Sequence, residues 1–144
     1  MRNFEKLTQD YLIELHEIWQ SAVAQGSKST ELKLRPRVHR YLTDAVSLIR
    51  PEARVLHEEA IPGTPYTPDW TIIDGNGGGA YCYGDHKSLS LHDAYKLTAS
   101  ETKQIERYLH YKLPVFVFDG LEIIWFDQER EQRASLVRKP TPPK

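Results

Sequence analysis

Hydrophobic residues recur at intervals of three and four along the first fifty positions, a spacing typical of amphipathic helices. One such run covers 4–25 and is followed by Gly26, a common helix stop. A second run covers 29–49; it opens on hydroxyl residues that can cap a helix and ends before Pro51. Pro36 lies early in this second run and predicts either a kink or a later start of the helix.

The rest of the chain predicts strands with one helix among them. Short apolar-rich or alternating runs predict strands at 53–61, 69–74, 80–89, 115–118 and 121–126. The glycine-rich segment 75–79 predicts a hairpin turn, because glycine accepts positive φ. A helix is expected over 98–113, where Thr98 and Glu101 form a capping-box pattern. Residues after 126 show only weak helical character.

This order of elements predicts a mixed α/β fold. A length of 144 residues is consistent with one domain, which we place at 1–138. Within it, 1–26 is expected to be an N-terminal helical extension and 27–126 the core. The proline-rich residues 139–144 are expected to be a tail or a linker to a further domain.

Composition narrows the class of protein. Hydrophobic residues make up 40% of the chain and charged residues 27%, as in ordinary globular domains. No apolar run approaches the roughly 18 residues of a membrane helix, and the charged N-terminus does not resemble a signal peptide. The single Cys82 excludes an internal disulfide and a cysteine-rich zinc site. We therefore expect a cytoplasmic protein with no membrane partner.

Net charge argues against a domain that holds nucleic acid by itself. The formal charge is −1 and the pI is about 6.6, whereas stand-alone nucleic-acid binders usually carry a basic excess. The main basic concentration is the segment 33–40. We therefore expect that any binding of DNA depends on a local group of basic residues or on another part of a longer chain.

Three charged residues lie where a half-buried hairpin should carry core side chains. Alternation along a strand places Asp85 and Lys87 on one face, and the chain reversal at 75–79 brings Asp69 to the same end of the hairpin. Two converging carboxylates repel each other unless a cation compensates. Lys87 could supply that charge as an ion-paired structural cluster, or a divalent cation such as Mg²⁺ or Mn²⁺ could bind there.

The motif Pro68-Asp69, fifteen intervening residues and Asp85-His86-Lys87 resembles that of the PD-(D/E)xK nuclease superfamily. The resemblance covers about 30–118, in the superfamily's order of helix, three strands, helix and strand. It implies a restriction-endonuclease-like core with a mixed central sheet, preceded here by an extra N-terminal helix. It also implies that Mg²⁺, replaceable by Mn²⁺, is held by Asp69, Asp85 and the backbone carbonyl of His86.

Further positions match the superfamily. Glu31, on the helix before the first core strand, would complete the metal site directly or through water; alternatively, it only complements the helix dipole. Gln104 and Tyr108 resemble the Gln-x-x-x-Tyr motif of some branches, in which the glutamine lies near the catalytic lysine or DNA. Otherwise they are one polar and one buried residue of an amphipathic helix. Contacts with DNA are expected from Arg35, Arg37 and Tyr108.

The resemblance implies a Mg²⁺-dependent endonuclease that cleaves double-stranded DNA, as the cleavage module of a restriction enzyme. Recognition, methyltransferase or translocase domains would then follow in a longer chain, and a dimer would allow cleavage of both strands. Lys87 would position or deprotonate the attacking water, or stabilise developing negative charge. A recombination or repair nuclease, or a catalytically silent scaffold, are the alternative functions.

Overall fold

The computed structural model describes residues 2–26, 30–87, 97–128 and 130–136. The chain divides into two compact units, Met1–Val55 and Leu56–Lys144, and each is described by itself. None of the helices described is long and apolar enough to cross a membrane.

The first unit contains α1 (Arg2–Ala24) and α2 (Thr30–Ile49), close to the two helices that the periodicity predicts. The helices pack through buried aromatic rings: Tyr11 stacks on Tyr41 with ring centroids 4.0 Å apart. The helix α2 begins at Thr30 and includes Pro36, so the alternative of a later start is excluded.

One mixed sheet runs through the described residues in the spatial order β1-β2-β3-β4-β5-β6. The strands are β1 (Ala53–His57), β2 (Trp70–Asp74), β3 (Gly79–His86), β4 (Val115–Phe118), β5 (Glu122–Phe126) and β6 (Glu131–Ser135). β3 pairs antiparallel with β2 and parallel with β4, while β5 pairs antiparallel with both of its neighbours. The helix α3 (Ala99–Leu109) connects β3 to β4. The predicted order of helix, three strands, helix and strand is therefore confirmed.

Several predicted boundaries are too long. β1 ends at His57 rather than at 61, because Glu58 adopts a left-handed conformation with φ of 53°. The helix α3 ends at Leu109 rather than at 113, and Lys112 after it has φ of 63°. The last residues of the predicted strand 80–89 lie outside the described residues.

The strand β6 contradicts the expectation of weak helical character after 126. All five of its residues are exposed, so no hydrophobic alternation marks it in the sequence. Pairing with β5 forms it: Phe126 lies opposite Glu131, and Glu122 lies opposite Ser135. Its position at the edge of the sheet explains its polar composition.

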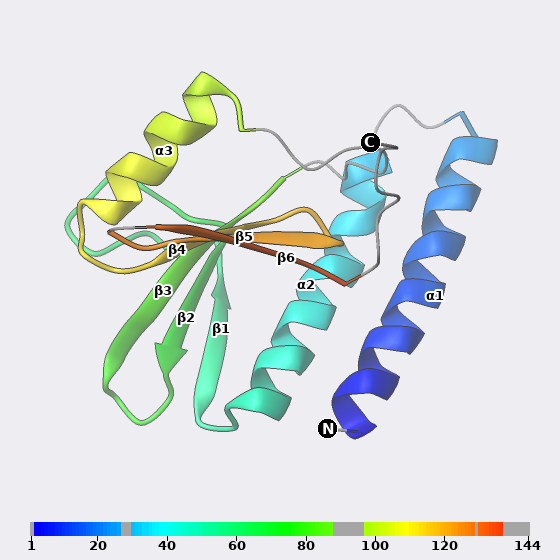
Figure 1. Cartoon of the computed structure of the whole chain (residues 1–144), viewed down its shortest axis with the longest axis horizontal. Coiled ribbons are helices and arrows are strands. Elements are labelled where there is room, and N and C mark those ends of the chain that lie inside the picture. The colour runs from blue at the N-terminus through cyan, green and yellow to red at the C-terminus, as the bar shows by residue number, and fades with distance from the viewer. Residues whose placement is uncertain (1, 27–29, 88–96, 129, 137–144) are drawn as a thin grey trace, which may run out of the picture. The chain divides into compact units, whose positions relative to one another are not determined.

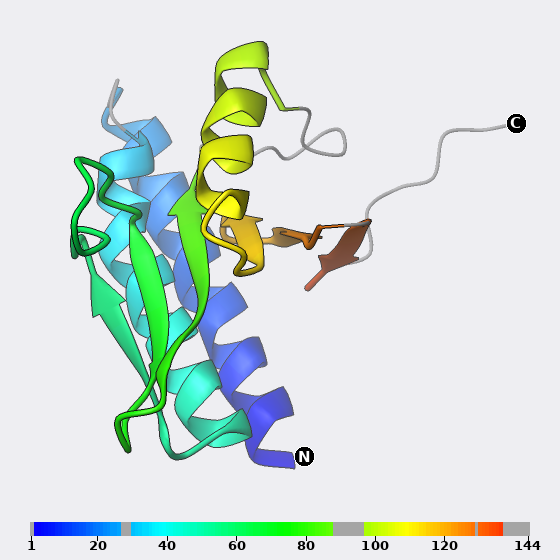
Figure 2. The ribbon, with the colours of Figure 1, turned by 90° about the vertical axis from the view of Figure 1, so that its left-hand side faces the viewer.

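The predicted hairpin β2–β3 is confirmed, and it sets the position of the acidic residues. Gly77 and Gly79 in its turn have φ of 90° and 91°, values that glycine tolerates best. Trp70 lies opposite Gly84. Asp69, just before Trp70, and Asp85, just after Gly84, therefore lie at the open end of the hairpin. Both views show the turn far from α3 and the open end close to it (Figures 1 and 2).

The two faces of the central strands have different neighbours. Tyr83, Val115 and Val117 are buried with Ile105 and Tyr108 of α3 in one hydrophobic cluster. The alternate positions pack aromatic rings, and Trp70 stacks on Phe116 with centroids 5.7 Å apart. Strand alternation therefore directs Asp85, two residues after Tyr83, toward the face that α3 covers.

Candidate active site

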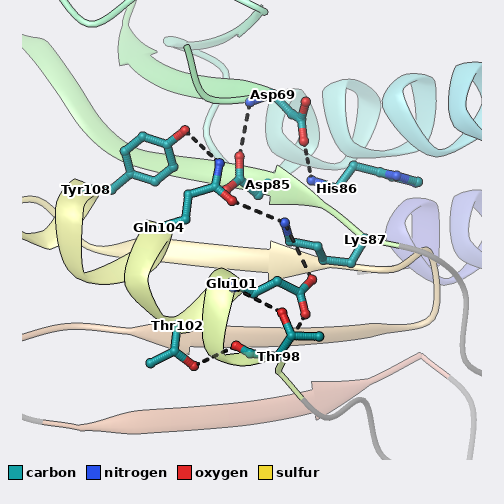
Figure 3. A network of polar contacts seen from close by, with 9 residues as sticks. All are labelled: Asp69, Asp85, His86, Lys87, Thr98, Glu101, Thr102, Gln104 and Tyr108. Atoms are coloured by element: carbon teal, nitrogen blue, oxygen red, sulfur yellow. Dashed lines mark hydrogen bonds and ion pairs between the residues drawn. The ribbon is translucent and has the colours of Figure 1, made fainter. Parts of the chain in front are cut away.

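The open end of the hairpin brings Asp69 and Asp85 together, as the alternation predicts (Figure 3). The backbone N–H of His86 donates to Asp69 Oδ2 at 2.7 Å, and that of Asp69 donates to Asp85 Oδ1 at 3.4 Å. Each carboxylate is thus oriented by the backbone of the neighbouring strand. Pro68 and Trp70, on either side of Asp69, are buried and hold its backbone in place.

Asp85 is an acid in a poorly solvated position. The residue is 2% exposed, and its buried Oδ2 has no hydrogen-bond partner among the described residues. Burial raises the pKa of Asp85 to about 6; Lys87 opposes this rise, and the charge of Asp69 adds to it. A cation near Oδ2 would favour the ionised form and relieve this cost.

Lys87 follows the same strand and turns toward α3. Its Nζ donates to Gln104 Oε1 at 3.4 Å and lies 3.6 Å from Glu101 Oε2. The structure thus brings Asp69, Asp85, Lys87 and Gln104 into one network, which extends from the hairpin to the helix (Figure 3). The positions of these four residues agree with the predicted cluster, and their catalytic role stays a prediction.

Glu101 is a member of this network that the sequence reasoning did not assign to the site. Its Oε1 accepts a hydrogen bond from the Thr98 N–H at 2.9 Å, and Thr98 Oγ1 accepts one from the Glu101 N–H at 3.1 Å. These reciprocal bonds form the predicted capping box. The other carboxylate oxygen faces Lys87, so one side chain both caps α3 and pairs with the lysine. The capping-box pattern indicated only the first of these contacts.

Two predicted DNA contacts are corrected. Tyr108 is 2% exposed, and its hydroxyl accepts a hydrogen bond from Gln104 Nε2 at 3.2 Å, so it supports Gln104 from within the core. Burial raises the pKa of Tyr108 to about 12, and the charge of Asp85 contributes.

The second correction concerns Arg37. Its side chain is 9% exposed; its Nε pairs with Glu14 at 2.7 Å, and its guanidinium lies 5.2 Å from the ring centroid of Tyr11. Arg37 therefore joins α1 to α2 and is not available to DNA.

The remaining predicted residues on α2 belong to the first unit, so their part in the site stays a prediction. Glu31 lies near the start of α2, in the first unit, and its side chain is outside the described residues. Arg35 lies on the same helix, where its Nε donates to His39 Nε2 at 3.3 Å. The ring of His86 is buried next to Trp70, with centroids 5.8 Å apart, so only the backbone of His86 is a candidate ligand.

The donor atoms at the hairpin end fit a hard divalent cation. No group of three or more His, Cys, Asp or Glu side chains suited to a metal occurs in the part of the chain that is described. Two carboxylates and one backbone carbonyl are nevertheless enough for Mg²⁺, which keeps several water ligands and is often bound by one or two carboxylates. The buried Oδ2 of Asp85 is the atom that most needs such a ligand.

Comparison with known proteins supports the fold. No protein-family model matches the sequence, and no curated protein matches it. Among solved structures, a chain in the cryoEM structure of the DrdV–DNA complex is similar, with a TM-score of 0.64 and 18% sequence identity. The alignment covers 91% of this chain and 12% of that chain, so this chain spans about one eighth of its length. The protein therefore has an α/β fold of the restriction-endonuclease-like type, with a six-stranded mixed sheet in its described part.

Proposed function

We propose that this chain is a metal-dependent endonuclease domain that hydrolyses phosphodiester bonds of double-stranded DNA. The observation that carries the proposal is the cluster of Asp69, Asp85 and Lys87 at one end of a hairpin, with Gln104 beside the lysine. A structural ion-pair cluster would leave no reason for a buried carboxylate oxygen without a partner. The fold, shared with part of a chain solved in complex with DNA, supports DNA as the substrate.

Asp69, Asp85 and the carbonyl of His86 would hold Mg²⁺, or Mn²⁺ in its place. When bound, the metal would polarise the scissile phosphate and lower the pKa of a bound water. Lys87 lies on the same strand face as Asp85 and is held by Gln104 and Glu101, so its ammonium group can orient the attacking water or stabilise the negative charge of the transition state. The Tyr108 hydroxyl accepts a hydrogen bond from Gln104 Nε2 and so holds this amide in place.

We further propose that the domain is the cleavage module of a restriction enzyme. The chain corresponds to a small part of the DrdV chain, and its net charge of −1 favours a partner domain that holds the DNA. Domains for recognition, methyl transfer or translocation are the expected companions, with 1–138 as the nuclease domain. Glu31 stays a proposed further metal ligand.

The test is nicking of supercoiled plasmid in Mn²⁺ by the wild type, Asp85→Asn and Lys87→Ala. We expect the wild type to nick the plasmid and both variants to lose at least about 100-fold in rate, since each removes a group required in the transition state. Circular dichroism checks that the variants are folded. Activity in Asp85→Asn equal to the wild type would reject the assignment. Metal binding by the wild type without any cleavage would favour a scaffold.

A further inference from the structure

A groove lies along α3, next to the candidate active site. Its first part, of about 400 Å³, is bounded by loop residues 65–67 and by α3 residues that include Lys103, Gln104 and Arg107. Its second part, of about 380 Å³, continues along the helix to His110 and Tyr111. Both parts share Tyr66, Lys103 and Arg107, so they are adjacent along the helix, and we call them together the α3 groove.

Two rows of α3 side chains border the groove and the candidate site. Ser100, Lys103, Arg107 and His110 follow one another at spacings of three, four and three, which places them in one row along the helix. Glu101, Gln104 and Tyr108 form a second row, about a quarter of a turn away at ~100° per residue. The first row lines the groove. In the second row Glu101 and Gln104 contact Lys87, and Gln104 and Tyr108 also border the first part of the groove.

The groove has a positive wall. Lys103 and Arg107 are exposed, and neither forms an ion pair with a carboxylate of the described residues. The Arg107 guanidinium lies over the ring of Tyr66 at 5.8 Å from its centroid, a contact that joins the helix to the loop where the two parts of the groove meet. Glu106 is an acid at the second part, and Ser100 and Thr67 add hydroxyl groups at the first.

The first part of the groove borders the candidate active site. The loop that forms one wall, 65–67, leads directly into Pro68 and Asp69. The opposite wall contains Gln104, which contacts Lys87. A polyanionic chain lying in the groove would therefore pass Lys103 and Arg107 and reach the edge of the site, close to Gln104 and to the loop that leads into Asp69.

We propose that the α3 groove receives the sugar–phosphate backbone of the DNA strand that is cut, with Lys103 and Arg107 each contacting a phosphate. This inference rests on the proposed nuclease function and adds the path of the substrate. The cations match a polyanion, and contacts to phosphate position the strand without reading its sequence. Because the chain has a net charge of −1, contacts with DNA have to come from a few basic residues close to the site, and Lys103 and Arg107 meet this requirement.

The experiment measures binding of a fluorescent 20-base-pair duplex by anisotropy, in EDTA and over a range of salt concentrations. Lys103→Gln/Arg107→Gln is compared with the wild type and with Lys112→Gln/Arg130→Gln. The control removes the same charge from two exposed residues that line a separate hollow. We expect the groove variant to bind several-fold more weakly at low salt. Its slope of log K against log[salt] should be shallower by about 1.8, since each lost phosphate contact removes about 0.9.

An unchanged affinity and slope in the groove variant would overturn the inference. So would an equal loss in the control variant, which would indicate a general charge effect, and so would a wild type that binds no duplex. Nicking in Mn²⁺ by the wild type and by Asp85→Asn tests the proposed function separately. If nicking depends on Asp85 but the groove variant binds DNA like the wild type, the proposed path of the DNA strand is rejected and the proposed nuclease function is retained.

Discussion

Among single residues, Asp85 carries the clearest conflict between stability and its proposed role. Its carboxylate is removed from water, and its pKa of about 6 lies above the ordinary value of 3.8. Between these two values the folded state binds more protons than the unfolded state, so stability falls as pH rises. The full stabilisation by the proton is present below about pH 3.8 and is lost as pH rises through about 6.

Replacement of Asp85 by Asn should therefore change how stability depends on pH. A shift of about 2 pKa units corresponds to up to about 3 kcal/mol. We expect the free energy of unfolding of the wild type, relative to Asp85→Asn, to decrease by up to this amount between pH 4 and pH 8 in metal-free buffer. Urea unfolding at several pH values measures it. Asp10→Asn, which removes an exposed carboxylate, is the control, and an equal pH dependence in both variants would contradict the burial argument.

Glu101 shows what the sequence could not predict at this scale. Strand alternation and one chain reversal were enough to place Asp69, Asp85 and Lys87 together, because both rules act over short distances. The pairing of Glu101 with Lys87 depends on how α3 packs on the sheet, which no local pattern encodes. The sequence pattern predicted the capping role of Glu101, but it did not predict the contact of its other carboxylate oxygen with Lys87.

Glu101→Gln should separate the two roles of this side chain. The amide oxygen can still accept the hydrogen bond from the Thr98 N–H, but the negative charge facing Lys87 is lost. We expect kcat for nicking to fall by about 10- to 100-fold with KM nearly unchanged, because Lys87 loses its fixed position. Thr98→Ala is the control: it should lower stability by about 1 kcal/mol without this loss in kcat. Equal kcat values in the wild type and Glu101→Gln would refute the positioning role.

At the scale of elements, the closeness of β3 to β4 depends on a glycine beside the site. Phe116 of β4 lies opposite Gly84 of β3, and its ring occupies the space that a Cβ at position 84 would need. The same ring stacks on Trp70, which follows Asp69. The glycine therefore allows the aromatic packing that holds both acid-bearing strands in register.

Gly84→Ala should destabilise the protein by about 1–3 kcal/mol, the usual cost of overpacking a core. Phe116→Leu makes room for the methyl group, so the alanine should cost less in that background. A double-mutant cycle measured by chemical denaturation gives the coupling between the two positions. Additive effects of the two substitutions would show that the ring and the glycine do not interact.

The elements also show where sequence patterns stop being informative. Helices with a repeated apolar stripe and the glycine-rich hairpin were predicted within a few residues, because periodicity and positive φ leave clear signals. The strand β6 left none, since all its residues are exposed and backbone pairing with β5 defines it. Side chains add to this pairing: Arg133 pairs at 3.2 Å with Glu122, which is buried, and Ser135 Oγ donates to the carbonyl of Leu121 at 3.5 Å.

At the scale of the whole molecule, the proposed metal site links ion binding to folding. An ion that binds the folded state alone raises the free energy of unfolding by RT ln(1 + [ion]/Kd). The unfolded chain separates Asp69 from Asp85 by fifteen residues and offers no such site. The stability of the entire chain therefore reports on the two carboxylates, even without any DNA.

Mg²⁺ at ten times its Kd should stabilise the wild type by about 1.4 kcal/mol, which for a chain of this size corresponds to a rise in Tm of about 3–6 °C. Asp85→Asn and Asp69→Asn should show a much smaller rise, because each leaves one carboxylate to hold the ion. Calorimetric scans in MgCl₂ and in NaCl of equal ionic strength separate specific binding from screening. Because this measurement needs neither substrate nor partner domains, equal shifts in the wild type and both variants would place Mg²⁺ elsewhere on the chain and remove the basis of the nuclease proposal.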